Sequence, residues 1–261
     1  MSLLDLLALS LIFFLTSVIS VVTGATSLIT VPALLAFGVP SVTALGTNML
    51  ALTAMSVGAS VPFLRGNVLD RPRLPLLIGL TLVGSVIGAL LVFALPQVWL
   101  PVIIAAAMLV VAAVVLRPQR SRPPVTGPPH RWHLALGYGL TFLLAVYGGF
   151  FSGGYVTLLT AAFLTAFRMP FLRAVATTKV INVASSLVAT LIFALKGAVD
   201  WRLGLILSAV MYAGATLGAQ WTLRMDERWI RRLFVTTVLL LALKTLVLDV
   251  PWHRLIHLGT V

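Results

Sequence analysis

One stretch of this sequence occurs twice, and it decides the fold. Residues 24–50 read GATSLITVPALLAFGVPSVTALGTNML, and residues 154–180 read GYVTLLTAAFLTAFRMPFLRAVATTKV. Extended outward, residues 24–112 align with residues 154–242 at 21 identities in 89 positions without a gap, where composition alone would give roughly a tenth. The identical residues include Gly24 and Gly154, Pro40 and Pro170, and Thr47 and Thr177. Because a period of 130 residues is far too long for a solenoid, the chain is one unit made of two related halves.

The composition is that of a membrane protein. Hydrophobic residues make up 60% of the chain and charged residues 9%, whereas soluble domains carry about 25% charged residues. Long apolar runs of roughly membrane-spanning length predict an all-α polytopic membrane protein with about eight hydrophobic segments. These runs cover residues 5–23, 43–64, 74–95, 99–116, 133–152, 173–194, 202–222 and 230–248, with shorter apolar pieces at 26–37 and 156–167.

Three further features of the composition limit the function. The first residues carry no basic region, so no cleaved signal peptide is expected. Cysteine is absent, which excludes disulfides and thiolate chemistry. The net charge of +12 lies in short loops between apolar runs, a pattern typical of membrane topology rather than of nucleic-acid binding.

The basic residues favour one of two topologies. Eight simple crossings would place ten of them on one side and six on the other. If residues 5–37 and 133–167 are instead hairpins that enter and return on the same side, thirteen face the cytoplasm and only Lys196, Arg202 and Arg254 face outward. The second arrangement follows the positive-inside rule better. Each half is then a re-entrant helical hairpin plus three transmembrane helices, and the halves form the inverted repeat of many secondary transporters.

Small and hydroxylated residues mark where these hairpins break. Residues 23–27 and 147–154 are rich in Gly, Ser and Thr, which favour helix ends. The pairs Gly84/Gly88 and Gly214/Gly218 are better interpreted as close helix packing. The predicted organisation is a single transport domain: a first repeat at 1–116, a basic proline-rich cytoplasmic linker at 117–131, a second repeat at 132–250 and a tail at 251–261.

The ionisable residues do not suit catalysis. All six carboxylates and all four histidines lie at or near predicted segment ends, so no catalytic pair, metal site or cofactor site is expected. Proton-linked transport would then require the substrate to carry the proton. Lys179 is the exception, because it lies inside a predicted helix and shares a face with Asn182. Two interpretations stay open: Lys179 faces a binding cavity, or its side chain snorkels to the cytoplasmic interface.

The sequence predicts an anion site where the two hairpins break. The first N–H groups of a half-helix lack partners, and the positive end of its dipole attracts anions. In an inverted repeat, the two breaks would meet near the midplane, together with hydroxyl and amide side chains and Lys179. The predicted substrate-binding residues are Gly24, Ala25, Thr26, Ser27, Thr47, Asn48, Ser152, Gly153, Gly154, Tyr155, Thr157, Thr177, Thr178, Lys179 and Asn182.

Both repeats resemble a known family. Residues 24–50 resemble the first-repeat signature of the TauE/SafE sulfite exporter family, and residues 147–182 and 196–202 resemble its second repeat. Two positions depart from the family pattern, since the first glycine cluster is sparser and Ala162 stands where a proline is common. The resemblance implies a bacterial transporter of sulfite, sulfonates or related small organic anions.

Together these observations predict a secondary transporter in the bacterial cytoplasmic membrane. Its partners are expected to be a small anionic substrate and the lipid bilayer, with a homo-oligomer as an open possibility and no nucleic acid. It would move a small oxyanion by alternating access between the two inverted halves. An anion channel and a carboxylate transporter stay as alternatives, and a membrane-embedded enzyme is disfavoured by the missing catalytic groups.

Overall fold

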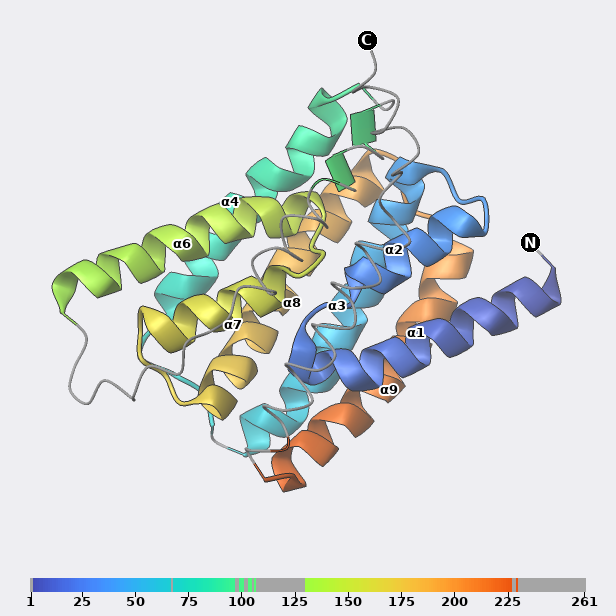
Figure 1. Ribbon diagram of the computed structural model, residues 1–261. Coiled ribbons are helices and arrows are strands. Elements are labelled where there is room, and N and C mark those ends of the chain that lie inside the picture. The colour runs from blue at the N-terminus through green and yellow to red at the C-terminus, as the bar shows by residue number, and fades with distance from the viewer. Residues whose placement is uncertain are drawn as a thin grey trace, which may run out of the picture.

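The computed structural model describes residues 2–66, 68–96 and 130–226, with single positions at 99–100, 103–104, 106 and 229. The described part of the chain is built from helices (Figure 1). They are α1 (Leu3–Thr23), α2 (Ser27–Ala36), α3 (Ser41–Arg65), α4 (Leu74–Ala94), α6 (Arg131–Phe150), α7 (Tyr155–Thr165), α8 (Phe171–Leu195) and α9 (Trp201–Arg224). The expected segment 230–248, the tail, most of 99–116 and nearly all of the linker lie outside the described residues.

Six of these helices are long and apolar enough to cross a membrane: α1, α3, α4, α6, α8 and α9. The helices α2 and α7 have only 10 and 11 residues, and each follows a long helix, as the sequence predicts. Large apolar side chains cover the outer surface, such as Leu11, Val83 and Leu205, each more than half exposed. Hydroxyl and amide side chains are instead buried between the helices. The all-α polytopic fold is therefore confirmed.

Each hairpin turns where the backbone becomes left-handed. Helix α1 starts at a capping box formed by Ser2 and Asp5 and ends at Gly24, whose φ is 70°. In the second repeat the turn is made by Ser152 at φ 64° and Gly154 at φ 75°. Glycine adopts this conformation without the steric penalty that other residues meet. The break in the second repeat is narrower than the sequence suggests, because Gly148 and Gly149 stay inside α6.

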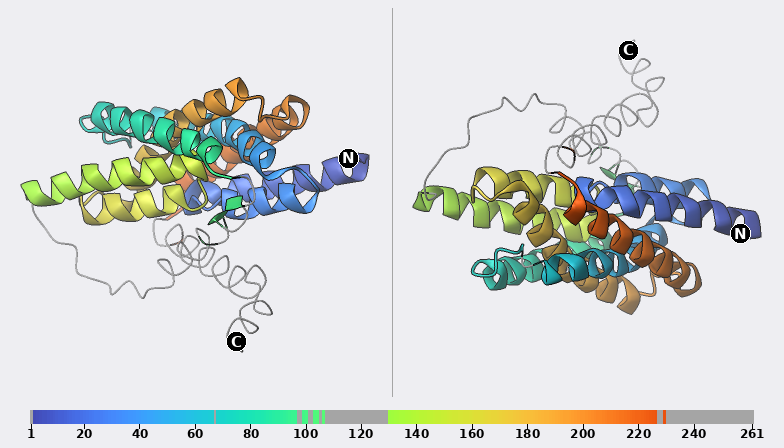
Figure 2. Two further views of the ribbon diagram at one scale, coloured as in Figure 1. Left: turned by 90° about the horizontal axis from the view of Figure 1, so that it is seen from above. Right: turned by 90° about the horizontal axis from the view of Figure 1, so that it is seen from below.

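Equivalent helices of the two repeats run in opposite directions. In Figure 1, α1 runs leftward from the N-terminus, whereas α6 begins at the left edge and runs rightward. Likewise α4 rises toward the top of the view and α9 descends to the bottom. The views from above and below show the same opposed course of α1 and α6 (Figure 2). The described helices thus have the arrangement expected of an inverted repeat.

The first helix of each repeat packs on a helix of the other repeat. Helix α1 packs on α9 of the other repeat, and its equivalent α6 packs on α4. Close backbone contacts make both pairings: a Cβ built on Gly88 would lie 1.9 Å from the carbonyl oxygen of Val146, and one on Gly218 would lie 2.4 Å from that of Val18. The packing interpretation of these glycines is confirmed. The helices α3 and α8 meet at the centre of the bundle.

Candidate functional site

The breaks of the two hairpins touch each other. A Cβ built on Gly24 would lie 2.8 Å from the backbone nitrogen of Thr157, in the first turn of α7. On the other side, a Cβ on Gly153 would lie 2.9 Å from Cδ2 of Leu28, in the first turn of α2. The hydroxyl of Thr157 donates a hydrogen bond of 2.5 Å to the carbonyl of Thr23 at the end of α1. The structure therefore brings the two breaks together. We call this contact, made by Thr23, Gly24 and Leu28 of the first repeat with Gly153 and Thr157 of the second, the crossing.

Lys179 lies at the crossing and is 1% exposed. Its Nζ donates a hydrogen bond of 2.7 Å to the carbonyl oxygen of Ser20, which also accepts from the N–H of Gly24 at the end of α1. The ammonium thus sits at the negative end of the α1 dipole. The interpretation that Lys179 snorkels to the interface is wrong, because the break in α1 offers a buried carbonyl to the side chain. Among the described residues, no carboxylate lies within ion-pair distance of it.

Two buried polar atoms on α8 and at the end of α1, the elements that Lys179 joins, have no hydrogen-bond partner within the described chain. Asn182, one turn further along α8, donates from Nδ2 to the hydroxyl of Ser56 on α3 at 2.7 Å. Its Oδ1 is buried and accepts nothing, and the buried hydroxyl of Thr23 is also unpaired. Buried polar atoms are normally hydrogen-bonded, so such atoms call for an explanation.

The half-helices present their N-terminal ends inside the protein. The N-caps Thr26 and Gly154 have no side-chain cap for the backbone N–H groups that follow. The hydroxyl of Thr26 instead contacts Sδ of Met55 at 3.5 Å. The predicted residues Ala25, Ser27 and Ser152 are buried in the same turns. These ends supply the partial positive charge that the sequence analysis expects at an anion site.

Asn48 and Thr178 hold the half-helices in place. Asn48 donates to the hydroxyl of Ser27 at 2.9 Å and accepts from that of Thr30 at 2.6 Å. In the second repeat, the equivalent hydroxyls of Thr160 and Thr178 lie 3.3 Å apart. The side chains predicted to bind substrate therefore fasten α2 to α3 and α7 to α8. Their part in binding stays a prediction.

Thr47 and Thr177 make a matched pair of contacts between the repeats. The hydroxyl of Thr47 accepts from the backbone N–H of Asp200 at 3.0 Å, and that of Thr177 accepts from the N–H of Asp70 at 3.2 Å. Each bond joins the start of a central helix to the loop before a helix of the other repeat. We call these two bonds the Thr–Asp latches. Both hydroxyls accept in these links between the repeats, and their predicted part in binding substrate stays a prediction.

Tyr155 points away from the crossing. Its ring packs on Gly148 in α6, and its hydroxyl has the hydroxyls of Thr81 and Ser185 as polar neighbours. This side chain is fully buried in the cluster between α4, α7 and α8. Only the backbone of Tyr155 therefore belongs to the turn that reaches the crossing.

Comparison with known proteins identifies the family. A family model described as sulfite exporter TauE/SafE matches residues 9–245. The chain belongs to the TauE/SafE family. A probable membrane transporter protein of Haemophilus influenzae is 30% identical over 255 residues, which cover 96% of this chain and 98% of the relative. The probable membrane transporter protein YfcA of Escherichia coli K12 is 29% identical over 260 residues, covering 96% and 94%. The chain is thus a membrane transporter of this family, and no solved structure matches it.

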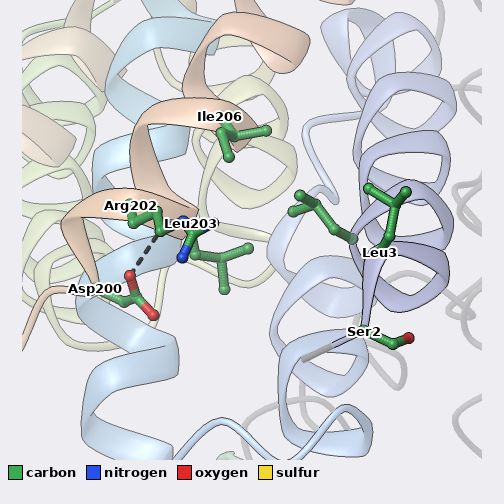
Figure 3. Close-up of a pocket in the computed structure, with 7 residues that line it drawn as sticks. Ser2, Leu3, Asp200, Arg202, Leu203 and Ile206 are labelled. Carbon is green, nitrogen blue, oxygen red and sulfur yellow. Dashed lines mark hydrogen bonds between the residues drawn. The ribbon is translucent and has the colours of Figure 1, made fainter.

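This TauE/SafE protein also has a surface cavity of about 360 Å³ beside one latch (Figure 3). The cavity opens between the start of α1 and the start of α9, where Asp200 accepts from the N–H of Leu203 at 3.0 Å. Its lining is formed by Ser2, Leu3, Leu6, Asp200, Arg202, Leu203 and Ile206. The cavity lies next to the Thr47 latch and is separate from the crossing residues.

Several residues of this TauE/SafE protein escape sequence reasoning. Asp70 sits at a predicted segment end, yet it is 4% exposed and forms an ion pair with Arg73. One signal could have revealed it, since Asp70 and Asp200 occupy equivalent repeat positions. Ser56 has the same signal, since Ser186 occupies its equivalent position, whereas Ser20 is equivalent to Phe150 and shows no such signal. In the described part of the chain, no group of His, Asp and Glu residues could hold a metal ion.

Proposed function

We propose that this protein is a secondary transporter of a small oxyanion, sulfite or an organosulfonate, across the bacterial cytoplasmic membrane. The observation that carries the proposal is Lys179, a buried cation with no carboxylate partner in the described chain, at the crossing of two broken helices. A buried ion costs several kcal/mol unless it is compensated. The Ser20 carbonyl compensates part of this charge, and a bound anion would compensate the rest.

Two further observations support this proposal. The family description names a sulfite exporter, and the relatives are named as probable membrane transporters. The names of these relatives also support the absence of enzymatic activity. The opposed repeats suit alternating access, in which each end of the protein opens to the crossing in turn.

Transport by purified protein in proteoliposomes tests the proposal. Vesicles would be offered sulfite, thiosulfate, methanesulfonate and acetate, each as a radiolabelled or conductometric uptake assay. We expect saturable uptake of a sulfur oxyanion that is accelerated when unlabelled substrate is present inside the vesicles. Conductance that does not saturate would identify a channel instead, and uptake of acetate alone would identify a carboxylate transporter. If none of these anions is transported, the proposal is refuted.

A further inference from the structure

The polar groups at the crossing bear on which form of the oxyanion is bound. We propose that the crossing binds a singly charged oxyanion that carries one O–H group, such as the hydroxyl form of hydrogensulfite, with Asn182 Oδ1 accepting the hydrogen bond from that O–H. This inference rests on the proposed function and narrows its substrate class. It concerns the protonation state of the substrate and the residue that recognises it.

The charge balance of the crossing fits a single negative charge. Of the described residues, Lys179 and Asp70 are the buried charged ones, and Asp70 is paired with Arg73. One unpaired positive charge therefore faces the ligand. A dianion would keep a second charge in a low-dielectric interior, where an uncompensated charge is strongly disfavoured. A monoanion leaves the site neutral.

Asn182 adds an acceptor that a bare anion could not satisfy. In the structure Nδ2 donates to the hydroxyl of Ser56, and Oδ1 is the amide atom that has no partner among the described residues. Asn182 follows Lys179 by three residues on α8, and side chains at this spacing are neighbours on a helix. An anionic oxygen beside Oδ1 would be repelled, whereas an O–H group would give Oδ1 its missing hydrogen bond. The ligand must therefore present a donor as well as a charge.

Thr23 supplies a hydroxyl on the α1 side of the crossing. It lies one turn after Ser20, the residue whose carbonyl binds Lys179, and its own buried hydroxyl has no partner among the described residues. A hydroxyl can donate to an anionic oxygen. The cation, the hydroxyl donor and the amide acceptor together match the three oxygens of HO–SO₂⁻: the two that share the charge, and the one that carries the hydrogen.

The three polar groups at the crossing occur in only one repeat each, unlike the residues of the Thr–Asp latches. The positions equivalent to Lys179, Asn182 and Thr23 hold Met49, Leu52 and Gly153. None of the three polar side chains has a polar counterpart, although the latch residues do. These three polar groups thus break the symmetry between the repeats, which suits one asymmetric ligand.

A pair of ligands of the same shape tests the proposal on the wild-type protein. Methanesulfinate, CH₃–SO₂⁻, carries the same single charge as HO–SO₂⁻ and has a methyl group in place of the hydroxyl. At a mildly acidic pH at which sulfite is mainly singly protonated, we expect hydrogensulfite to compete for uptake roughly 10- to 100-fold better than methanesulfinate, because only hydrogensulfite satisfies Asn182. Equal competition would overturn the inference while leaving oxyanion transport intact. If neither ligand competes or is transported, the proposed function fails as well.

The variant Asn182→Leu places the first-repeat residue in the second repeat. Without the amide acceptor, we expect the preference for hydrogensulfite over methanesulfinate to fall to about one or to reverse. A preference that survives in Asn182→Leu would show that another group reads the O–H, and would overturn the role given to Asn182. The matched control is Leu187→Asn, which adds an amide to α8 at a lipid-exposed position and should keep the wild-type preference.

Discussion

The first and the second repeat share the threonines and aspartates that latch them together and the glycines at their breaks, Gly24 and Gly154, but they differ in the polar side chains at the crossing. The latch residues Thr47 and Thr177 are identical, as are Asp70 and Asp200. At the crossing, in contrast, the position of Lys179 in the second repeat is equivalent to that of Met49 in the first. The latches therefore use residues that both repeats share, whereas the charged side chain of the candidate site occurs in only one repeat.

The largest loss of stability is expected at the glycines where two helices pack most closely. Gly88→Ala adds a Cβ that would lie 1.9 Å from a backbone oxygen of α6, and Gly218→Ala adds one 2.4 Å from a backbone oxygen of α1. Since backbone cannot yield as a flexible side chain does, we expect each variant to lose about 3 kcal/mol or more, or to fail to fold. Thermal unfolding followed by size-exclusion chromatography in detergent measures this loss. Gly79→Ala, with nothing within 4 Å of its Cβ, is the control and should behave as wild type.

The crossing is tested by making the two repeats alike. In Lys179→Met the second repeat receives the residue of the first, and we expect uptake to fall by roughly 30-fold or more because the anion loses its counter-charge. Thermal stability should stay the same or rise, since a buried unpaired cation is removed. Uptake and unfolding are both measured on the same preparation. Unchanged anion affinity would refute the role of Lys179, and the exposed Lys196→Met is the control.

Removing either Thr–Asp latch should cause a smaller loss of stability, and the loss should be similar for the two latches. Thr47→Val and Thr177→Val each leave a backbone N–H of the other repeat without its acceptor, so each should lose about 1–3 kcal/mol of stability. Because the two bonds are equivalent, the two variants should lower the unfolding temperature by similar amounts. Thr165→Val removes a hydroxyl that bonds only within its own helix and should lose less. A large loss in one latch variant alone would show that the repeats are not equivalent there.

The orientation of the repeats is tested with no expected effect on activity. The chain has no cysteine, so Gly66→Cys and Lys196→Cys introduce single labels at exposed, equivalent positions at the ends of α3 and α8. In an inverted repeat, a membrane-impermeant maleimide should label the two from opposite sides of the membrane. Labelling of both from the same side would contradict the inversion.

Much of the fold follows from patterns within single segments. Apolar runs locate the six long helices, and the glycine and hydroxyl clusters locate both breaks, since helix propensity acts over a few residues. The distribution of basic residues suggests the hairpins. Gly148 and Gly149 show the limit of this reasoning, because packing against Tyr155 and Ser85 keeps them helical. Local propensity alone does not report such contacts.

The candidate site is harder to predict because its contacts join distant parts of the chain. Lys179 binds a carbonyl 159 residues away, and Asn182 binds Ser56, 126 residues away. The direction of a side chain at a break is also not set by spacing, as Tyr155 shows. Sequence periodicity places residues on a helix face, whereas the partner across that face depends on how the whole bundle closes.

The packing of α1 and α6 on helices of the other repeat has a consequence for the origin of the protein. A lone copy of the first repeat would leave α1 and α4 without α9 and α6, the helices on which they pack. Two copies of one ancestral half-length chain would supply each other with those surfaces only if they entered the membrane in opposite directions. Gene fusion would then have made permanent a pairing that such an ancestor needed from the start.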